Sequence, residues 1–425
     1  MKQNWLKSVY NQNQFVFKLG LTVMLVGLGL IFLLSQSSNE IPNIFHNGIN
    51  SHVVDTDDLV ESVKDLSQIH QKDNGTEKCD IFDGEWVPNL GSLAYTNNTC
   101  KWIESHQNCM ENGRTDIGYM YWKWKPKACE LLRFDAKKFL EMMRDQSWAF
   151  VGDSIIRNQF HSFICLISQV EEAVVLYHDD EYHDQKWRFP THNLTVSVIW
   201  SPFLAKSDVF EDKNGVSSPD IHVHVDILDK IWTEQYHTWD YILFSCGKWF
   251  TKPTFYYERN SILGCHACEG KHTDLGIDFA YRKTLKSLFR YIIESNHKAT
   301  IFYRTATPDH FENGTWSTGG TCDRTVPANE GEFELTYFDR ILQEVELQEV
   351  SKVEAEAFIK GLKVKLLDVM KLSLLRPDGH PGPLRQFDPF AKDKKAKVQY
   401  DCLHWCLPGP IDYWNDLLMN MVVNG

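Results

Sequence analysis

The chain has 425 residues, 43% hydrophobic and 13% aromatic, a composition that excludes a disordered or fibrous protein. Its 44 basic and 57 acidic residues give a net charge of −13, which argues against binding to nucleic acid through the phosphate backbone. The length allows two or three average domains, or one large α/β domain with additions. For the 14 tryptophans, burial in a core is the common role and saccharide binding is the alternative.

The N-terminal segment predicts a membrane anchor. Lysines precede an uncharged stretch over residues 19–39, apolar as far as Leu34, which is close to the shortest length that spans a bilayer. Acidic residues follow the stretch, so the positive-inside rule places residues 1–18 in the cytosol and all later residues in the lumen. A cleaved signal peptide is the alternative, but residues 35–38 form a weak cleavage site. We therefore expect a single-pass type II protein of the early secretory membranes, which suit short spans.

In the lumen, asparagines can be glycosylated and cysteines can form disulfides. Four N-glycosylation sequons follow the expected span, at Asn74, Asn97, Asn193 and Asn313. All 11 cysteines lie beyond residue 78, so disulfides are expected, and one thiol must stay free or pair with another chain.

Composition divides the lumenal part into three segments. Residues 40–78 are polar without periodicity, which is typical of a stem. Residues 79–134 are dense in cysteine and aromatic residues. Residues 135–425 are expected to form the catalytic domain, which opens with a helix over 135–144.

The rest of the chain alternates between strands and helices. A buried strand is predicted over 148–151, and apolar residues at helical spacing predict a helix over 155–168. The later expected strands are 194–200, 241–244, 299–303 and 364–367, and the later expected helices are 279–295 and 332–347. This alternation predicts a parallel sheet with helices on both faces.

Gly152-Asp153-Ser154 stands between the first strand and its helix. Ligands of open α/β sheets bind beyond the carboxyl ends of the strands, where Ser154 falls, and free N–H groups at a helix start can stabilise an oxyanion. The Ser154 hydroxyl is therefore a candidate nucleophile. The alternative is that Asp153 or Ser154 only caps the helix.

A serine nucleophile needs a base, and Asp401 with His404 is the best candidate pair. Three residues apart in one helical turn, the two side chains would face the same side, so the carboxylate could orient the imidazole. Asp309-His310 and Asp378-Gly379-His380 lack this spacing, and we expect them to be structural or to shape the substrate site.

Other chemistries find little support. The sequence has no G-x-S-x-G elbow, no H-E-x-x-H and no Walker motif. Cys265 and Cys268, with His272, could imitate a zinc site, but in an oxidising lumen a C-x-x-C pair favours disulfide chemistry. No metal site is expected.

Six segments occur in order: CDIFDGEWVPN, HQNCMENGR, YWKWKPKAC, FVGDSIIRNQ, YRTATPDHFENGTW and DCLHWCLPGPIDYWN. Together they closely resemble the plant trichome birefringence-like family, from about Cys79 to Leu418. The resemblance implies an SGNH/GDSL-esterase-like fold and a polysaccharide O-acetyltransferase of the Golgi membrane. It also implies a triad of Ser154, His404 and Asp401.

The resemblance implies further residue roles. Arg157 stands where the family has an oxyanion-supporting arginine, beside Gly152 and Asp153. Gly247 is the best candidate for a second oxyanion glycine, and the usual third group, an asparagine, has no clear counterpart. The implied disulfides are Cys79–Cys129, Cys100–Cys165, Cys109–Cys406 and Cys322–Cys402, with Cys265–Cys268 an open possibility.

Within the family, the segments GCHACEGKHTDLG, TPDHFENGTWSTGGTC and LSLLRPDGHPGP are most similar to the xyloglucan-acetylating branch. The expected acceptor is thus a galactosyl side chain of xyloglucan, with xylan or mannan as alternatives. No cofactor is expected to stay bound; acetyl-CoA or a lumenal acetyl carrier would be a co-substrate, supplied through a membrane protein. An acetyl esterase is the rival enzyme, and a non-catalytic wall-polymer-binding protein is the rival from another class.

Overall fold

A computed structural model describes residues 79–209, 221–268 and 270–424. The expected cytosolic tail, anchor and stem, with Asn74, lie outside the described residues. Among the helices that are described, none is both long and apolar enough to cross a membrane.

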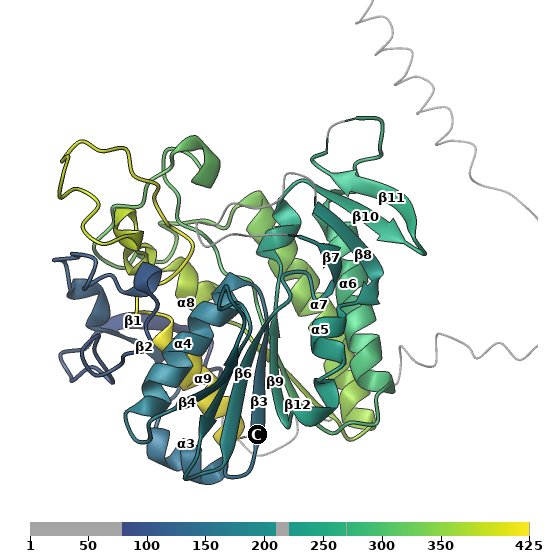
Figure 1. Cartoon of the computed structure of the whole chain (residues 1–425), viewed down its shortest axis with the longest axis horizontal. Coiled ribbons are helices and arrows are strands. Elements are labelled where there is room, and N and C mark those ends of the chain that lie inside the picture. The colour runs from purple at the N-terminus through teal and green to yellow at the C-terminus, as the bar shows by residue number, and fades with distance from the viewer. Residues whose placement is uncertain (1–78, 210–220, 269, 425) are drawn as a thin grey trace, which may run out of the picture. The chain divides into compact units, whose positions relative to one another are not determined.

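A seven-stranded sheet forms the centre of the structure (Figure 1). Its order is β13-β12-β9-β3-β6-β5-β4, and the first five of these strands run parallel. In chain order the strands are β3 (Ser147–Gly152), β4 (Val174–His178), β5 (Gln185–Phe189), β6 (Leu194–Trp200), β9 (Tyr241–Ser245), β12 (Thr300–Arg304) and β13 (Lys363–Leu367). The five strands predicted for a parallel sheet do run parallel, but the sheet as a whole is mixed, because β4 and β5, which were not predicted, extend one edge antiparallel. The turns that join β4, β5 and β6 are too short for a parallel crossover.

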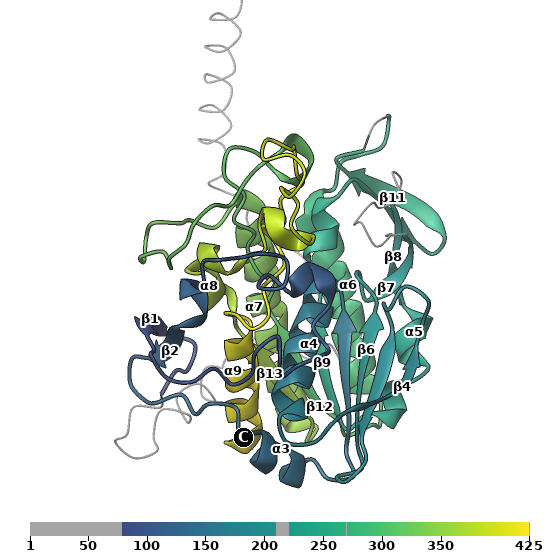
Figure 2. The same ribbon diagram turned by 60° about the vertical axis from the view of Figure 1, so that its left-hand side comes forward.

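Helices cover both faces of this sheet because alternate strand residues point to opposite sides. Ala149 and Val151 of β3 belong to the core under α5 (Lys230–Thr233), α6 (Gly276–Glu294) and α7 (Tyr337–Ile359). Trp148 and Phe150 belong to the core under α3 (Ala136–Met142), α4 (Ser154–Ser168) and α9 (Asp412–Val423). Figures 1 and 2 show the two helical layers on either side of the strands.

The helix predicted over 332–347 has different bounds in the structure. It begins after Thr336, whose side chain accepts the N–H of Asp339, and continues to Ile359. Buried residues as far along as Val353 and Ala357 keep this long helix packed on the sheet, whereas the prediction ended before them. The other predicted elements agree with observed ones to within about three residues at each end.

Two smaller sheets were not predicted. One has the order β11-β10-β8-β7, formed by β7 (Ala205–Asp208), β8 (Ile221–Leu228), β10 (Thr254–Glu258) and β11 (Ser261–His266). The other is an antiparallel pair, β1 (Gly84–Pro88) and β2 (Trp122–Pro126), in the cysteine-rich segment. This pair lies beside α8 (Met370–Leu374), and the Trp86 indole N–H donates to the Leu372 carbonyl at 2.8 Å (Figure 2).

Disulfides tie the cysteine-rich segment to the rest of the described chain. The structure contains Cys79–Cys129, Cys100–Cys165, Cys109–Cys406, Cys322–Cys402 and also Cys265–Cys268. Cys265 and Cys268, for which a zinc site and a disulfide were both considered, form a disulfide. Cys246 is the remaining thiol, and burial raises its pKa so that it stays protonated.

Candidate active site

The carboxyl end of β3 delivers Ser154 to the edge of the sheet. Asp153 caps α4, because its carboxylate accepts the N–H groups of Ile155 at 3.0 Å and Ile156 at 3.4 Å. Ser154 is the first helical residue, and its hydroxyl is not used in the cap. The helix is therefore capped by Asp153, and the neighbouring Ser154 hydroxyl remains available for another role.

Glycines let the backbone pass closely at this edge. A Cβ on Gly152 would lie 1.9 Å from the carbonyl oxygen of Ser245, its partner in β9, so no other residue fits there. Gly247 follows two residues after Ser245, with φ +135°, and a Cβ would lie 3.2 Å from the Ala306 side chain. Gly247 therefore lies at the same carboxyl edge of the sheet as Ser154, and its role at an oxyanion stays a prediction.

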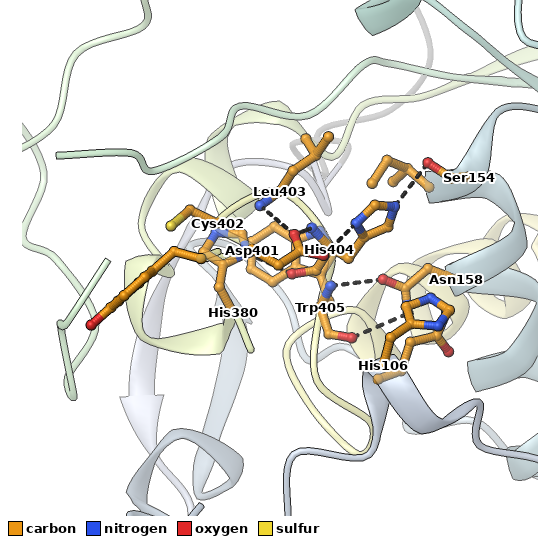
Figure 3. A network of polar contacts seen from close by, with 12 residues as sticks. His106, Ser154, Asn158, His380, Asp401, Cys402, Leu403, His404 and Trp405 are labelled. Atoms are coloured by element: carbon orange, nitrogen blue, oxygen red, sulfur yellow. Dashed lines mark hydrogen bonds and ion pairs between the residues drawn. The ribbon is translucent and has the colours of Figure 1, made fainter. Parts of the chain in front are cut away.

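Asp401 and His404 lie in an irregular turn between η7 (Pro383–Arg385) and α9, so the predicted helical turn is wrong. The carboxylate itself organises the turn: Oδ1 accepts the backbone N–H groups of Leu403 at 3.1 Å and His404 at 2.9 Å. Oδ2 lies 2.8 Å from Nδ1 of His404 (Figure 3). The D-x-x-H spacing brings the two groups together through this side-chain cap instead of through helix geometry.

In the structure, two successive hydrogen bonds connect the three candidate triad residues. Nε2 of His404 lies 2.8 Å from Oγ of Ser154, across 250 residues of sequence (Figure 3). Because Nδ1 donates to the Asp401 carboxylate, Nε2 carries the lone pair and accepts the serine hydroxyl proton. Burial opposes the charge on Asp401, but the adjacent His404 and its backbone N–H prevail and hold the pKa of this carboxyl well below its usual range. The carboxylate is thus ionised and fixes the tautomer that a general base needs.

Asn158 clamps the turn onto α4, a contact that the sequence analysis did not predict. Its Oδ1 accepts the N–H of Trp405 at 2.7 Å, and its Nδ2 donates to the Trp405 carbonyl at 3.2 Å. Asn158 follows Ser154 by four residues, so both side chains lie on one helix face. One face of α4 therefore carries the hydroxyl and also fixes the residue after His404. The helical spacing of the two residues was the signal available in the sequence.

The cysteine-rich segment adds residues that sequence reasoning missed. The rings of His106 and His404 meet edge to face with centroids 5.9 Å apart. Glu104 lies 3.4 Å from Nδ1 of His106 and 3.3 Å from Nε2 of the buried His161. Burial lowers the pKa of His106 to about 4 and also lowers that of His161, so both rings are neutral near pH 7. In acid, where these histidines are protonated, they and Arg157 outweigh the burial of Glu104 and lower its pKa to about 2. An ionised carboxylate and neutral imidazoles therefore border the candidate base.

Arg157 belongs to this cluster. It lies three residues after Ser154 on α4, and its charge acts on Glu104 and His106. Its Nη1 is buried and finds no hydrogen-bond partner within the described part of the chain. A buried guanidinium N–H on a residue one helical turn after Ser154 is suited to stabilise negative charge.

The two rival base motifs do not reach Ser154. Asp309 pairs with Lys248 at 3.1 Å, and that lysine also binds the buried Asp339. His310 and His380 contact one another and bind backbone carbonyls, including that of His404. Both motifs thus lie next to the Asp401–His404 turn but face away from the hydroxyl.

Three of the four sequons lie in the described chain. Asn313 is exposed and Asn97 is partly exposed. Asn193 is exposed, but its side chain bridges Asp145 at 2.9 Å and Arg188 at 2.7 Å. Over residues 79–209, 221–268 and 270–424, no three metal-ligating side chains gather into a metal site.

Family models match nearly all of the described chain. Residues 131–421 match the GDSL/SGNH-like acyl-esterase family found in Pmr5 and Cas1p, and residues 77–130 match the PMR5 N-terminal domain. The first of these matches covers the central sheet, α4 and the Asp401–His404 turn.

Curated relatives agree with the family models. The chain is 49% identical to protein trichome birefringence-like 24 of Arabidopsis thaliana over 359 residues, 83% of this chain and 84% of that one. It is 44% identical to trichome birefringence-like 23 of the same plant over 433 residues, 100% of this chain and 99% of the relative. Xyloglucan O-acetyltransferase 1 of Arabidopsis thaliana is 40% identical over 346 residues, 81% of this chain and 80% of that one. The chain therefore belongs to the trichome birefringence-like proteins, within the GDSL/SGNH-like acyl-esterase family.

Proposed function

We propose that this protein is an O-acetyltransferase that transfers acetyl groups to hydroxyls of a plant cell-wall matrix polysaccharide, on galactosyl side chains of xyloglucan. The observation that carries the proposal is the line from Asp401 through His404 to Ser154, with both contacts at 2.8 Å. Membership of an acyl-esterase family and the 40% identity to a xyloglucan O-acetyltransferase support the reaction and the acceptor.

In the first half-reaction, Oγ of Ser154 attacks the carbonyl carbon of the acetyl donor while Nε2 of His404 takes the hydroxyl proton. The Asp401 carboxylate stabilises the imidazolium that forms. The tetrahedral oxyanion is stabilised by the backbone N–H of Ser154, which the Asp153 cap does not use, by the backbone N–H of Gly247 and by Arg157. The oxyanion collapses, His404 protonates the leaving group, and an acetyl ester remains on Ser154.

In the second half-reaction, a sugar hydroxyl replaces the departed donor. His404 removes its proton, the alkoxide attacks the acetyl carbonyl, and Ser154 leaves with the proton returned by His404. Water in place of the sugar would make the protein an esterase. Whether a sugar hydroxyl or water reaches the acetyl ester thus decides between transfer and hydrolysis.

The same proposal includes the cellular setting. Residues 19–39 anchor the protein in the Golgi membrane with residues 1–18 cytosolic, so the acetyl-enzyme forms in the lumen. The donor is acetyl-CoA or a lumenal acetyl carrier, which a membrane protein supplies. The hydropathy and charge of the N-terminal sequence support this setting.

The test uses the purified full-length protein with a labelled acetyl donor. Xyloglucan oligosaccharides with and without galactose, xylan and mannan oligosaccharides, and buffer alone are offered as acceptors. We expect acetyl transfer to the galactosylated oligosaccharide and an acetyl ester on Ser154 that the Ser154→Ala variant lacks. Release of free acetate at the same rate in every mixture would identify an esterase. Transfer to xylan or mannan alone would overturn the acceptor, and transfer that persists in Ser154→Ala would overturn the mechanism.

A further inference from the structure

His310 and His380 form a buried pair behind the Asp401–His404 turn. Nδ1 of His310 lies 2.7 Å from Nε2 of His380. The side chains are 2% and 4% exposed, so water does not compete for these nitrogens. His310 follows β12, and His380 follows η6 (Pro377–Gly379), so two separate segments meet at this contact.

The outer nitrogen of each ring faces a backbone carbonyl. Nε2 of His310 lies 2.9 Å from the Leu374 oxygen, and Nδ1 of His380 lies 2.7 Å from the His404 oxygen. A carbonyl can only accept, so both outer nitrogens must carry hydrogen. A neutral imidazole has one N–H, so two neutral rings would leave two lone pairs facing each other 2.7 Å apart. One additional proton between the rings removes this conflict.

We propose that His310 and His380 share one proton and, as a singly charged pair, hold the backbone of His404 in its reactive position. Both are positioning residues, since neither reaches Ser154. The existence of the shared proton does not depend on the proposed acetyl transfer, whereas its effect on the rate does.

The neighbouring contacts explain why this pair would control the turn. The His310 backbone N–H donates to the Cys402 carbonyl at 3.0 Å, and the His380 ring packs on Trp405 with centroids 4.3 Å apart. The two histidines thus contact Cys402, His404 and Trp405, all in the turn that carries the candidate base. Asn158 and the disulfides of Cys402 and Cys406 also hold the turn, so loss of the pair would remove the support at the His404 carbonyl and leave the others in place.

The charged groups around the pair come from every element packed against it. They are Asp309 with its partner Lys248, Asp378 with its partner Arg376, Arg114 bound to the Asp378 backbone carbonyl, and Asp401 with His404. Asp378 pairs with Arg376, whereas Asp309 shares Lys248 with the buried Asp339. The buried Asp401 carboxylate acts favourably on the charge of His380, and Asp309 and Asp378 act favourably on that of His310.

Burial opposes the charge and lowers the pKa of both rings. The shared proton therefore leaves at a lower pH than the proton of an exposed histidine, and the pair titrates as a unit. Below that pH all three hydrogen bonds are present. Above it the proton passes to water, the contact between the rings opens, and the turn loses a support.

The first experiment tests the proton without relying on activity. In full-length Ser154→Ala protein with ¹⁵N-labelled histidine rings, we expect a pH titration to show one N–H···N signal that couples two rings. His310→Asn and His380→Asn should each abolish this signal, while His297→Asn, which removes another ring bound to a carbonyl, should leave it. Two rings that remain neutral and uncoupled throughout the pH range of the folded protein would overturn the proposal.

The second experiment tests positioning. The side-chain amide that His310→Asn introduces can donate to Nε2 of a neutral His380, so this variant should keep the clamp on His404 without a titrating proton. We expect wild-type kcat to fall as pH rises through the titration of the pair, and this limb to be absent in His310→Asn. His310→Leu should lose up to ~10²-fold in kcat with little change in KM, the size that a small misplacement of a catalytic group can cost.

Identical pH profiles for the wild type and His310→Asn would refute the positioning role even if the shared proton is found. If no variant transfers acetyl at any pH while the N–H···N signal is present, the proposed function fails and the shared proton stands. A His310→Leu protein that does not fold leaves the decision to His310→Asn and to the spectra of Ser154→Ala.

Discussion

Replacing Asp401 with Asn should leave the protein folded and reduce acetyl transfer by up to ~10⁴-fold, the loss typical for this role. The Asn oxygen can still accept the backbone N–H groups of Leu403 and His404, so the turn keeps its two local hydrogen bonds. The amide nitrogen, however, would face Nδ1 of His404 at the 2.8 Å position, where two donors cannot meet. His404 would change tautomer and donate from Nε2 to Ser154 instead of accepting its proton.

A 10⁴-fold loss corresponds to about 5.4 kcal/mol of activation free energy at 1.36 kcal/mol per tenfold. The assay is the single-turnover rate of acetyl-enzyme formation by the full-length protein. Asp309→Asn is the matched control, since its carboxylate pairs with Lys248 and does not face His404, so we expect a mild effect. A rate for Asp401→Asn within tenfold of wild type, or a greater loss in Asp309→Asn, would refute the assignment of the base.

The other predictions concern the nucleophile, a disulfide, a buried acid and glycosylation. Ser154→Ala should abolish the acetyl ester and leave the thermal unfolding midpoint almost unchanged, because Asp153 is the residue that caps α4. Cys406→Ser removes one of the two disulfides that link the cysteine-rich segment to the rest of the described chain and should lower the free energy of unfolding by ~2–5 kcal/mol, measured in denaturant under non-reducing conditions. Burial raises the pKa of Glu346 to about 8, so the folded state keeps a proton that the unfolded state releases near its ordinary value of about 4.5. Stability from this group is therefore complete below that ordinary value and is lost as pH rises toward 8, and unfolding of Glu346→Gln between pH 5 and 8 should show a flatter pH dependence than wild type. Glycosidase treatment of the plant-expressed protein should lower its apparent mass, and an unchanged mass in every single-sequon variant would count against a lumenal location.

Local sequence pattern was sufficient for the elements that build the central sheet. The apolar runs at 148–151 and 194–200 and the helical spacing after Ser154 predicted β3, β6 and α4, because burial on one or both faces leaves a clear period in the sequence. The antiparallel edge formed by β4 and β5, the sheet of β7, β8, β10 and β11, and the full length of α7 were not predicted. Apart from the eight-residue β8, the missed strands of these two sheets have four to six residues, and pairing partners distant in sequence decide whether such segments form strands.

For the candidate site too, the sequence predicted some features and only the tertiary structure showed the others. The chemical types of Ser154, Asp401 and His404, and their motifs, were readable in the sequence because a nucleophile, a base and an orienting carboxylate require those side chains. That the three meet across 250 residues at 2.8 Å depends on the packing of the Asp401–His404 turn against the start of α4. The clamp by Asn158, the nearness of Glu104 and His106, and the contact between His310 and His380 are also long-range. Composition and spacing determined which groups this protein has available, and only the packing of distant segments decided which of them share a hydrogen bond.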